Sequence, residues 1–233
     1  MDDKIKTIKI KLGGYQPKSS VHNRAAEVFG KELTKNLGHR VDYEMDGDMP
    51  KTQGIKAFDL PRLVENGNLT MCYFASSYLV DRVPEMGIFD VPFLIQSRKK
   101  IYEALEGELG DIMKQNVLSS MGLRILGFWD NGFRHFTNGV REIRTPRDCI
   151  DLRMRTMKSD AHREFFGLLG FEPTYVDVAD LVSQIKSKEL DAQEKELDKS
   201  NKENDRLKQQ VHHLEEYLKL KLNTKENHKE YPE

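Results

Sequence analysis

Two arginines stand where packing alone does not readily explain a charge. Arg155 lies inside LRMRTM, an expected strand, and Arg134 ends a stretch of aromatic and polar residues, GFWDNGFRH. A guanidinium group inside a strand is costly to bury unless an anion pairs with it. That anion is either an internal carboxylate, such as Asp130 or Asp151, or a bound ligand. Because the planar fork of arginine can hold both oxygens of a carboxylate, a ligand site is one of two open interpretations.

The residues around Arg134 carry a second signal. Trp129, the only tryptophan, follows an apolar run and is expected in the core. Phe133 stands beside Asn131 in a turn-like stretch, where neither helix nor strand packing accounts for an aromatic ring. We therefore expect Phe133 to pack against a bound ligand.

The chain has no short enzyme signature. It contains no phosphate-binding glycine loop, no nucleophile elbow and no zinc-protease helix, and no carboxylate pair stands out as an acid–base couple. The spacing of its two cysteines, Cys72 and Cys149, matches no metal or redox motif. We expect a protein that is not an enzyme and that needs neither a metal nor a cofactor.

Charge and hydropathy narrow the range of partners. The 233 residues carry a net charge of −1, so no general attraction to nucleic acid is expected. The apolar runs are too short to span a bilayer, and the N-terminal residues lack the apolar core of a signal peptide. The chain is expected to be either cytoplasmic or the mature form of an exported protein.

Strands and helices alternate through the first 185 or so residues, which predicts an α/β fold with mostly parallel sheets. Apolar runs and alternation predict strands at 7–13, 40–45, 69–75, 123–129, 152–157 and 189–193, with an edge strand or a crossover at 87–95. Cap residues and apolar periodicity predict helices after Ser20, Ser97, Thr145 and Ser159, and also at 58–67 and 176–187.

In parallel sheets, ligands bind beyond the carboxyl ends of the strands. Four short segments follow expected strands: GGYQP, SSY, DNGFRHFTN and KSD. If these ends converge, Arg134 and Arg155 face one cleft.

The last part of the chain differs in composition. From Lys186 onward about half of the residues are charged and glycine is absent. Leucine, valine and one asparagine recur every seven residues, at Leu190, Leu197, Asn204, Val211 and Leu218. This pattern predicts a helix over 190–222, which either pairs with a second copy in a coiled coil or packs on its own domain.

Several segments taken together resemble one protein family. VPEMGIFDVPFLI, LGFWDNGFRHFTN, IRTPRDCIDLRMRTM and LDAQE occur in the order and spacing of the DctP-like solute-binding proteins of TRAP transporters, and IKLGGYQPKSSVHNRAAEVF looks like the opening strand and helix of that family. The similarity covers residues 5 to about 197. After DAQE the family usually continues with an asparagine and a proline, whereas Lys195 and Glu196 stand here.

The resemblance implies a two-lobed periplasmic receptor, a mature form without signal peptide, that closes around a small organic anion and delivers it to a membrane permease. We expect a first lobe at 1–128, a partial second lobe at 129–197 and a charged tail at 198–233. The alternative is a truncated relative that no longer transports and acts through its terminal helix. The expected ligand contacts are Arg155, Arg134, Tyr15, Ser76, Asn131, Phe133 and Gln193.

Overall fold

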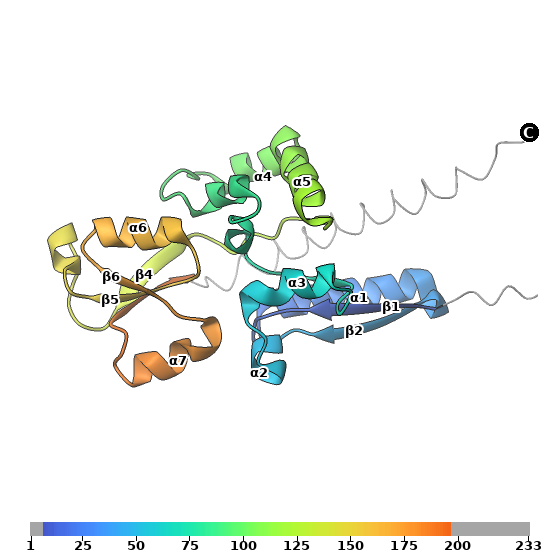
Figure 1. Ribbon diagram of the computed structural model, residues 1–233, viewed down its shortest axis with the longest axis horizontal. Helices are drawn as coiled ribbons and strands as arrows, with labels where there is room; N and C mark the ends of the chain where they lie inside the picture. Colours follow the sequence, from blue (N-terminus) through green and yellow to red (C-terminus); the bar gives the residue numbers. More distant parts are fainter. Residues whose placement is uncertain (1–6, 197–233) are drawn as a thin grey trace, which may run out of the picture.

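The computed structural model describes residues 7–196, which form two small sheets joined by a helical region (Figure 1). The first sheet has the strand order β2-β1-β3 and the second the order β4-β7-β5-β6. Every described strand pairing is parallel except that of β4 with β7. The predicted α/β fold with mostly parallel sheets is confirmed.

In chain order the strands are β1 (Ile8–Gly13), β2 (Val41–Asp46), β3 (Met71–Cys72), β4 (Arg134–Asn138), β5 (Arg153–Thr156), β6 (Glu172–Tyr175) and β7 (Ala192–Glu196). The α-helices are α1 (Val21–Leu37), α2 (Met49–Gln53), α3 (Leu60–Glu65), α4 (Arg98–Glu106), α5 (Glu108–Met121), α6 (Asp160–Leu168) and α7 (Val178–Lys186). Short 3-10 helices cover Gly38–Arg40, Ala57–Asp59, Ser76–Leu79, Pro84–Asp90 and Pro146–Cys149.

Helices lie on both sides of the first sheet, with α3 in front of it and α1 behind it in Figure 1. The hydroxyl of Tyr43 on β2 donates to the Ala26 carbonyl of α1 at 2.8 Å. The cap predicted for α1 is present, because the side chain of Ser20 accepts the backbone N–H of Asn23. The Ser97 and Ser159 side chains cap α4 and α6 in the same way.

In the second sheet, α6 lies along one side of the strands and α7 beyond the other (Figure 1). Its core combines Met154 and Ala192 from the strands with Phe166 of α6 and Phe171. The rings of Phe166 and Phe171 meet edge to face, with centroids 5.6 Å apart. This small core fixes the end of β5, where Arg155 stands.

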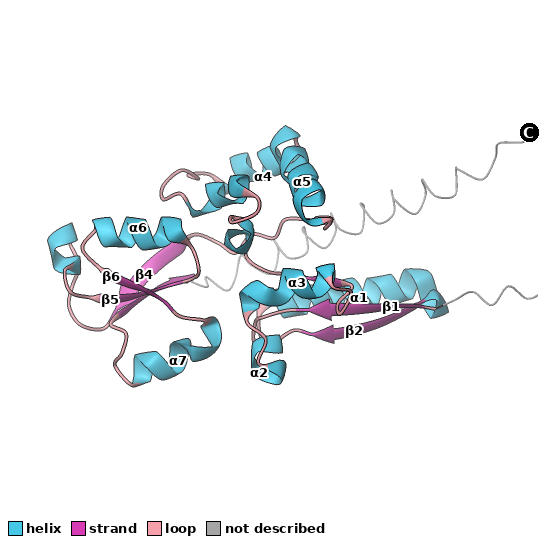
Figure 2. Ribbon diagram, in the orientation of Figure 1, coloured by secondary structure: helices cyan, strands magenta, loops and turns pink. Residues whose placement is uncertain are grey.

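The strand predicted at 123–129 is wrong. The segment from 122 to 133 runs as an irregular link between α5 and β4 (Figure 2), and its side chains Leu123, Ile125 and Phe128 pack against a cluster that includes Met113 and Val117 of α5. Apolar alternation is therefore used here for packing on a helix and not for pairing in a sheet.

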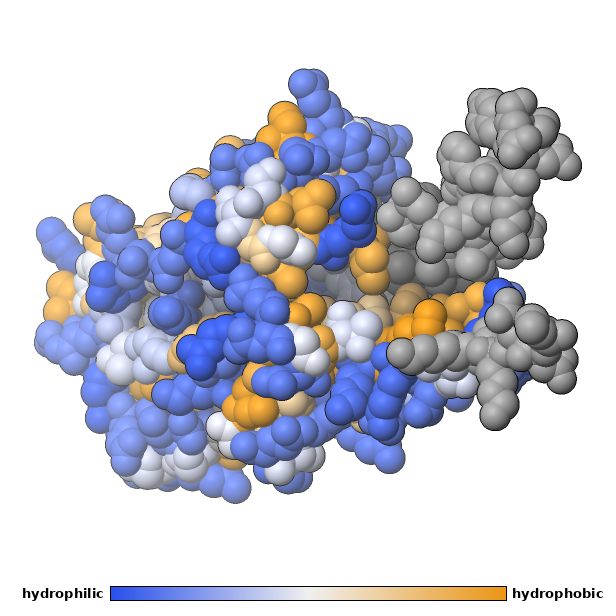
Figure 3. All heavy atoms as spheres, turned by 45° about the vertical axis from the view of Figure 1, so that its right-hand side comes forward, coloured by the Kyte–Doolittle hydropathy of each residue, from blue (hydrophilic) through white to orange (hydrophobic). Residues whose placement is uncertain are grey.

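The face in Figure 3 is largely hydrophilic, with apolar side chains gathered where the helical region borders the parts below it.

Two further strand predictions need correction. The segment 87–95 was expected to be an edge strand or a crossover, and it is not a strand, because a 3-10 helix that ends at Asp90 is followed by irregular chain. The run 69–75 keeps only two ladder residues, Met71 and Cys72.

The sequence pattern did not predict strands β4 and β6. The long helix expected after Ser97 is two helices, α4 and α5, which meet at Gly107.

The predicted helix over 190–222 is wrong at its start, because Ala192–Glu196 form strand β7. The rest of that helix and the predicted tail at 198–233 lie outside the described residues. Within residues 7–196, no helix is long and apolar enough to cross a membrane.

Candidate functional site

Asn23, on the buried face of α1, holds together the segments that follow the strands of the first sheet. Its side-chain amide donates to the Gln16 and Pro17 carbonyls after β1, at 2.8 and 3.0 Å, and lies 3.3 Å from the Gly47 carbonyl after β2. Its oxygen accepts the hydroxyl of Tyr73, just beyond β3, at 2.8 Å. One fully buried neutral side chain therefore fixes three strand ends.

Aromatic rings continue from these strand ends toward the second sheet. Tyr15 lies 5.6 Å from Tyr73 and 6.4 Å from Tyr78 between ring centroids. Phe58 is 6.4 Å from Tyr78 and 6.3 Å from Tyr175, which ends β6 of the second sheet. The rings therefore make a continuous series that crosses from one sheet to the other.

Trp129 and His22 extend this series from Tyr73, whose ring centroid lies 5.7 Å from that of Trp129. The His22 ring stacks on Tyr73 at 5.6 Å and on Trp129 at 6.1 Å. Burial lowers the pKa of His22 to about 4, so the imidazole is neutral at pH 7. Trp129 is half-buried, and it ties the link between the sheets to the start of α1.

Arg155 stands near the carboxyl end of β5 and is 9% exposed. Its Nε donates to the Val176 carbonyl at 3.0 Å, and Gln193 of β7 is its neighbour across the sheet. Burial raises the pKa of both Tyr78 and Tyr175. The charge of the buried Asp177 raises the pKa of both phenols as well, and the charge of Arg155 lowers it. The guanidinium group therefore lies close to a tyrosine from each part of the molecule.

Arg134 reaches the same strand end from β4. Its Nη1 lies 2.9 Å from the sulfur of Met157, two residues beyond Arg155. The hydroxyl of Ser77, next to Ser76, lies 3.7 Å from that sulfur. Met157 is therefore the point where β4, β5 and the segment after β3 meet.

Asp90 forms a buried polar contact beside this point. It accepts the hydroxyl of Ser77 at 2.6 Å and that of Ser159 at 2.9 Å, and the Nε2 of His162 lies 3.6 Å from the carboxylate. The Asp90 and His162 side chains are only 5% and 6% exposed. Because Ser159 caps α6 and His162 lies in its first turn, this group joins the two parts of the chain.

Asn131 and Phe133 lie on the link that precedes β4. The guanidinium carbon of Arg98 is 5.2 Å from the Phe133 ring centroid, and the ring is 44% exposed. Asp130 accepts the Gly132 N–H and the Tyr102 hydroxyl, and its Oδ2 lies 3.5 Å from Arg98 Nε. These contacts place Phe133 against α4, whereas the next residue, Arg134, reaches toward Met157.

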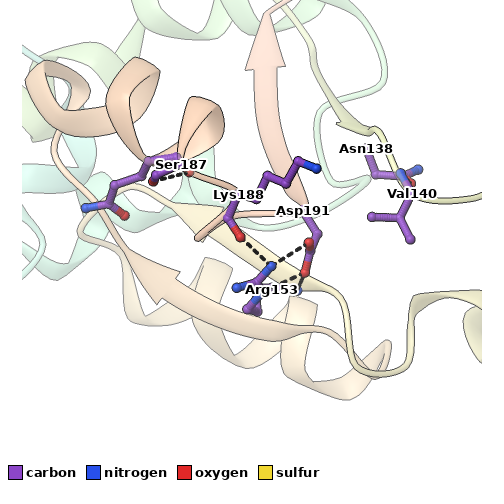
Figure 4. Close-up of polar contacts among 7 residues, drawn as sticks. Asn138, Val140, Arg153, Ser187, Lys188 and Asp191 are labelled. Carbon is purple, nitrogen blue, oxygen red and sulfur yellow. Dashed lines mark hydrogen bonds and ion pairs between the residues drawn. The ribbon is translucent and has the colours of Figure 1, made fainter.

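A second arginine on β5 has a structural partner. Arg153 donates to the two carboxylate oxygens of Asp191 through Nε and Nη2, both at 2.8 Å. Its Nη2 also donates to the Lys188 carbonyl at 2.7 Å (Figure 4). This pairing lowers the pKa of Asp191 to about 2. The bidentate contact holds the turn before β7, and so it holds Gln193 beside Arg155.

The structure thus brings Arg155, Arg134 and Gln193 to one end of the second sheet. Ser76 precedes Ser77, which lies near Met157, and Tyr15 contacts Tyr78, so both residues lie next to this end. This arrangement of cations and hydroxyls suits a small anion.

The family described as bacterial extracellular solute-binding protein, family 7, matches residues 12–219. The chain belongs to this family. The match also extends past residue 197, where the motif resemblance stopped.

Relatives of this solute-binding protein include the 2,3-diketo-L-gulonate-binding periplasmic protein YiaO of Escherichia coli, 31% identical over 56% of the chain and 40% of the relative. A TRAP periplasmic solute-binding protein of Polaromonas, solved with D-erythronate, is 26% identical with a TM-score of 0.73 and covers 81% of the chain and 61% of that protein. One from Sulfurospirillum deleyianum, solved with succinate, is 24% identical with a TM-score of 0.74 over 81% of the chain and 60% of that protein.

The chain of this solute-binding protein spans about half the length of the first curated relatives, 56%, 40% and 50%. Family membership confirms the prediction that the protein is not an enzyme. Three site residues escaped the sequence reasoning: Asn23, Tyr78 and Tyr175. Only for Asn23 was there a signal, a polar residue on the helix face that also carries Ala26 and Gly30.

Proposed function

We propose that the protein is an extracytoplasmic receptor that captures a small organic acid by its carboxylate and delivers it to the membrane permease of a TRAP-type transporter. The observation that carries this proposal is the position of Arg155, a buried guanidinium near the end of β5, with Gln193 beside it and Arg134 in contact with Met157, two residues beyond Arg155. A carboxylate there gains charge-assisted hydrogen bonds in a partly dry site. The acids held by solved relatives support the same ligand class.

In this proposal Arg155 binds the carboxylate and Arg134 supplies a second positive charge. Tyr15 and Ser76 approach from the first sheet, Gln193 from β7, and Asn131 and Phe133 from the link. The two lobes, 1–128 and 129–197, close about this link when the acid binds, as in other hinged binding proteins.

A thermal-shift panel of organic acids on the whole chain tests the proposal. At least one acid is expected to raise the melting temperature, and Arg155→Ala is expected to abolish that shift. Arg144→Ala removes an exposed guanidinium, 77% accessible in its side chain, and serves as the matched control. A folded protein that responds to no acid, or an Arg155→Ala variant that responds like the control, contradicts the proposal.

The heptad pattern of residues 204–218 suggests a second role, self-association as a homodimer. A relative without transport function would act through this contact alone. Light scattering of the whole chain and of a variant lacking residues 198–233 tests it. A dimer that becomes monomeric on deletion supports the role, and a monomeric whole chain rules it out.

A further inference from the structure

The surroundings of Arg155 carry information on the body of the ligand, beyond its carboxylate. The side chain of Arg155 extends to the Val176 carbonyl, next to Tyr175 in the chain. From Tyr175 the ring series runs through Phe58 and Tyr78 to Tyr15 on the first sheet. An acid held by Arg155 therefore meets ring edges and faces from both parts of the molecule.

Three ring contacts in this series are edge to face, with interplanar angles of 64° to 71°. They join Tyr15 to Tyr78, Tyr78 to Phe58, and Phe58 to Tyr175. Tilted rings of this kind accept a further aromatic ring against an edge or a face. A chain of hydroxyl groups has a different requirement, because each buried hydroxyl needs its own hydrogen-bond partner. The described series carries phenol hydroxyls at Tyr15, Tyr78 and Tyr175, of which that of Tyr175 donates to Asp177 at 3.2 Å, and its remaining surface is apolar ring.

Positive charge also surrounds Phe58. The Nζ of Lys158 lies 4.9 Å from its ring centroid and 3.8 Å from the Asp81 carboxylate, and the Nζ of Lys56 lies 5.7 Å from the ring. Cations close to the ring increase the electrostatic preference of the site for an anion, while the ring itself stays apolar. Charge and aromatic surface therefore coincide at one place.

We propose that the preferred ligand is an aryl carboxylate, a monocarboxylic acid whose body is an aromatic ring, with Tyr175, Phe58 and Tyr78 as the residues that determine this specificity. The inference rests on the proposed function, since it assumes that Arg155 holds the carboxylate. It differs from that function in predicting which acid binds best.

Isothermal titration of the whole chain with four probes tests the inference: benzoate, phenylacetate, D-galactonate and succinate. At least one of the two aryl acids is expected to bind about tenfold or more tightly than D-galactonate and succinate. Binding of every acid that binds is expected to disappear in Arg155→Ala.

Two substitutions at one position separate ring from hydroxyl. Tyr175→Phe keeps the ring and is expected to retain aryl-acid affinity within about twofold, whereas Tyr175→Ala is expected to lower it about five- to tenfold. Tyr175 is 39% exposed, so the fold tolerates both changes. Phe93→Ala removes a ring that is 81% exposed and is the matched control.

Each outcome has a distinct meaning. Tighter, Arg155-dependent binding of D-galactonate or succinate overturns the aryl inference and leaves the proposed function standing. An equal loss of affinity in Tyr175→Phe and Tyr175→Ala overturns it too, because the hydroxyl would then be the determinant. Absence of any binding in a folded sample contradicts the proposed function itself, and the inference with it.

Discussion

The two sheet ends that approach each other carry different kinds of side chain. In the first sheet, one neutral amide, Asn23, fixes the chain after three strands, and the side chains beyond it are rings. In the second sheet, the strand ends carry the guanidinium groups of Arg155 and Arg134. The first side therefore supplies mainly ring surface, and the second supplies the guanidinium groups together with the ring of Tyr175.

This difference separates two kinds of cost. A buried amide with several partners contributes to folding, because its removal leaves carbonyl groups without hydrogen bonds. A buried charged group that serves ligand binding contributes less to folding, because the cost of taking its charge out of water offsets its contacts. We therefore expect substitutions in the first sheet to reduce stability and substitutions at Arg155 to reduce binding.

The largest loss of stability is expected for Asn23→Ala. It leaves the Gln16 carbonyl without its buried partner and removes one hydrogen bond each from the Pro17 and Gly47 carbonyls and the Tyr73 hydroxyl, which is expected to lower the free energy of unfolding by about 3–5 kcal/mol. Urea denaturation measures the change. Asn36→Ala, which removes an exposed amide from the same helix, is the control, and similar losses in both variants would refute the special role of Asn23.

The second largest loss of stability is expected in acid, at His22, which stacks on Tyr73 and Trp129 beside the first sheet. The pKa of His22 falls from 6.5 to about 4 in the folded protein because of burial, so the unfolded chain binds this proton at higher pH than the folded one. Its contribution is complete above pH 6.5 and is lost as the pH falls toward 4, by up to about 3 kcal/mol. Melting temperatures of His22→Phe between pH 7 and 4.5 should fall less than those of the wild type. An unchanged slope would exclude His22 as the cause, and His39→Phe is the control.

The contact that joins the two sides is expected to have an intermediate effect. Asp90→Asn keeps the shape of the side chain but replaces one acceptor oxygen by a donor, opposite the hydroxyls of Ser77 and Ser159 and near His162. The expected loss in the free energy of unfolding is about 2 kcal/mol. Asp81→Asn, at a carboxylate that is 80% exposed, is the control. Equal denaturation midpoints for both variants would show that Asp90 does not hold the two sides together.

The smallest effect on stability is expected at Arg155, where the effect on binding is greatest. Arg155→Met replaces the guanidinium by an apolar chain and removes the hydrogen bond to the Val176 carbonyl, so the free energy of unfolding is expected to fall by about 1 kcal/mol. Arg153→Met, which breaks the bidentate pair with Asp191, is expected to cost about 1–2 kcal/mol. If Arg155→Met proved the more damaging in urea, Arg155 would have a structural role and the contrast between the two sides would fail.

Local patterns predicted the elements whose signals are local. Ser20, Ser97 and Ser159 each cap a helix, and the alternation of β1 and β2 produces a paired ladder. The strand expected at 123–129 failed because a strand needs a neighbour, and the apolar side chains there pack on α5 instead. Short β6, with a proline at its second position, gave no pattern to detect.

The same limit applies to the candidate site. Arg155 was recognisable because a charge inside an apolar strand is unusual in any fold. Tyr78 and Tyr175 were not recognisable, since tyrosine is common both in cores and on surfaces, and only the folded chain brings the two within reach of Arg155 and Phe58. The ligand contacts expected at all seven residues stay predictions, including Phe133, which packs against Arg98.

The strand order of the second sheet also governs the sequence in which the site is assembled. Within the described residues, β4 is hydrogen-bonded only to β7, which begins at residue 192, long after β4 ends at residue 138. During synthesis the N-terminal part of a chain can fold first, and a contact across a long loop must wait for its far end. The ring surface around Asn23 can therefore form while β4 still has no partner strand, and Arg134 takes its place beside Met157 only after Ala192–Glu196 have been made.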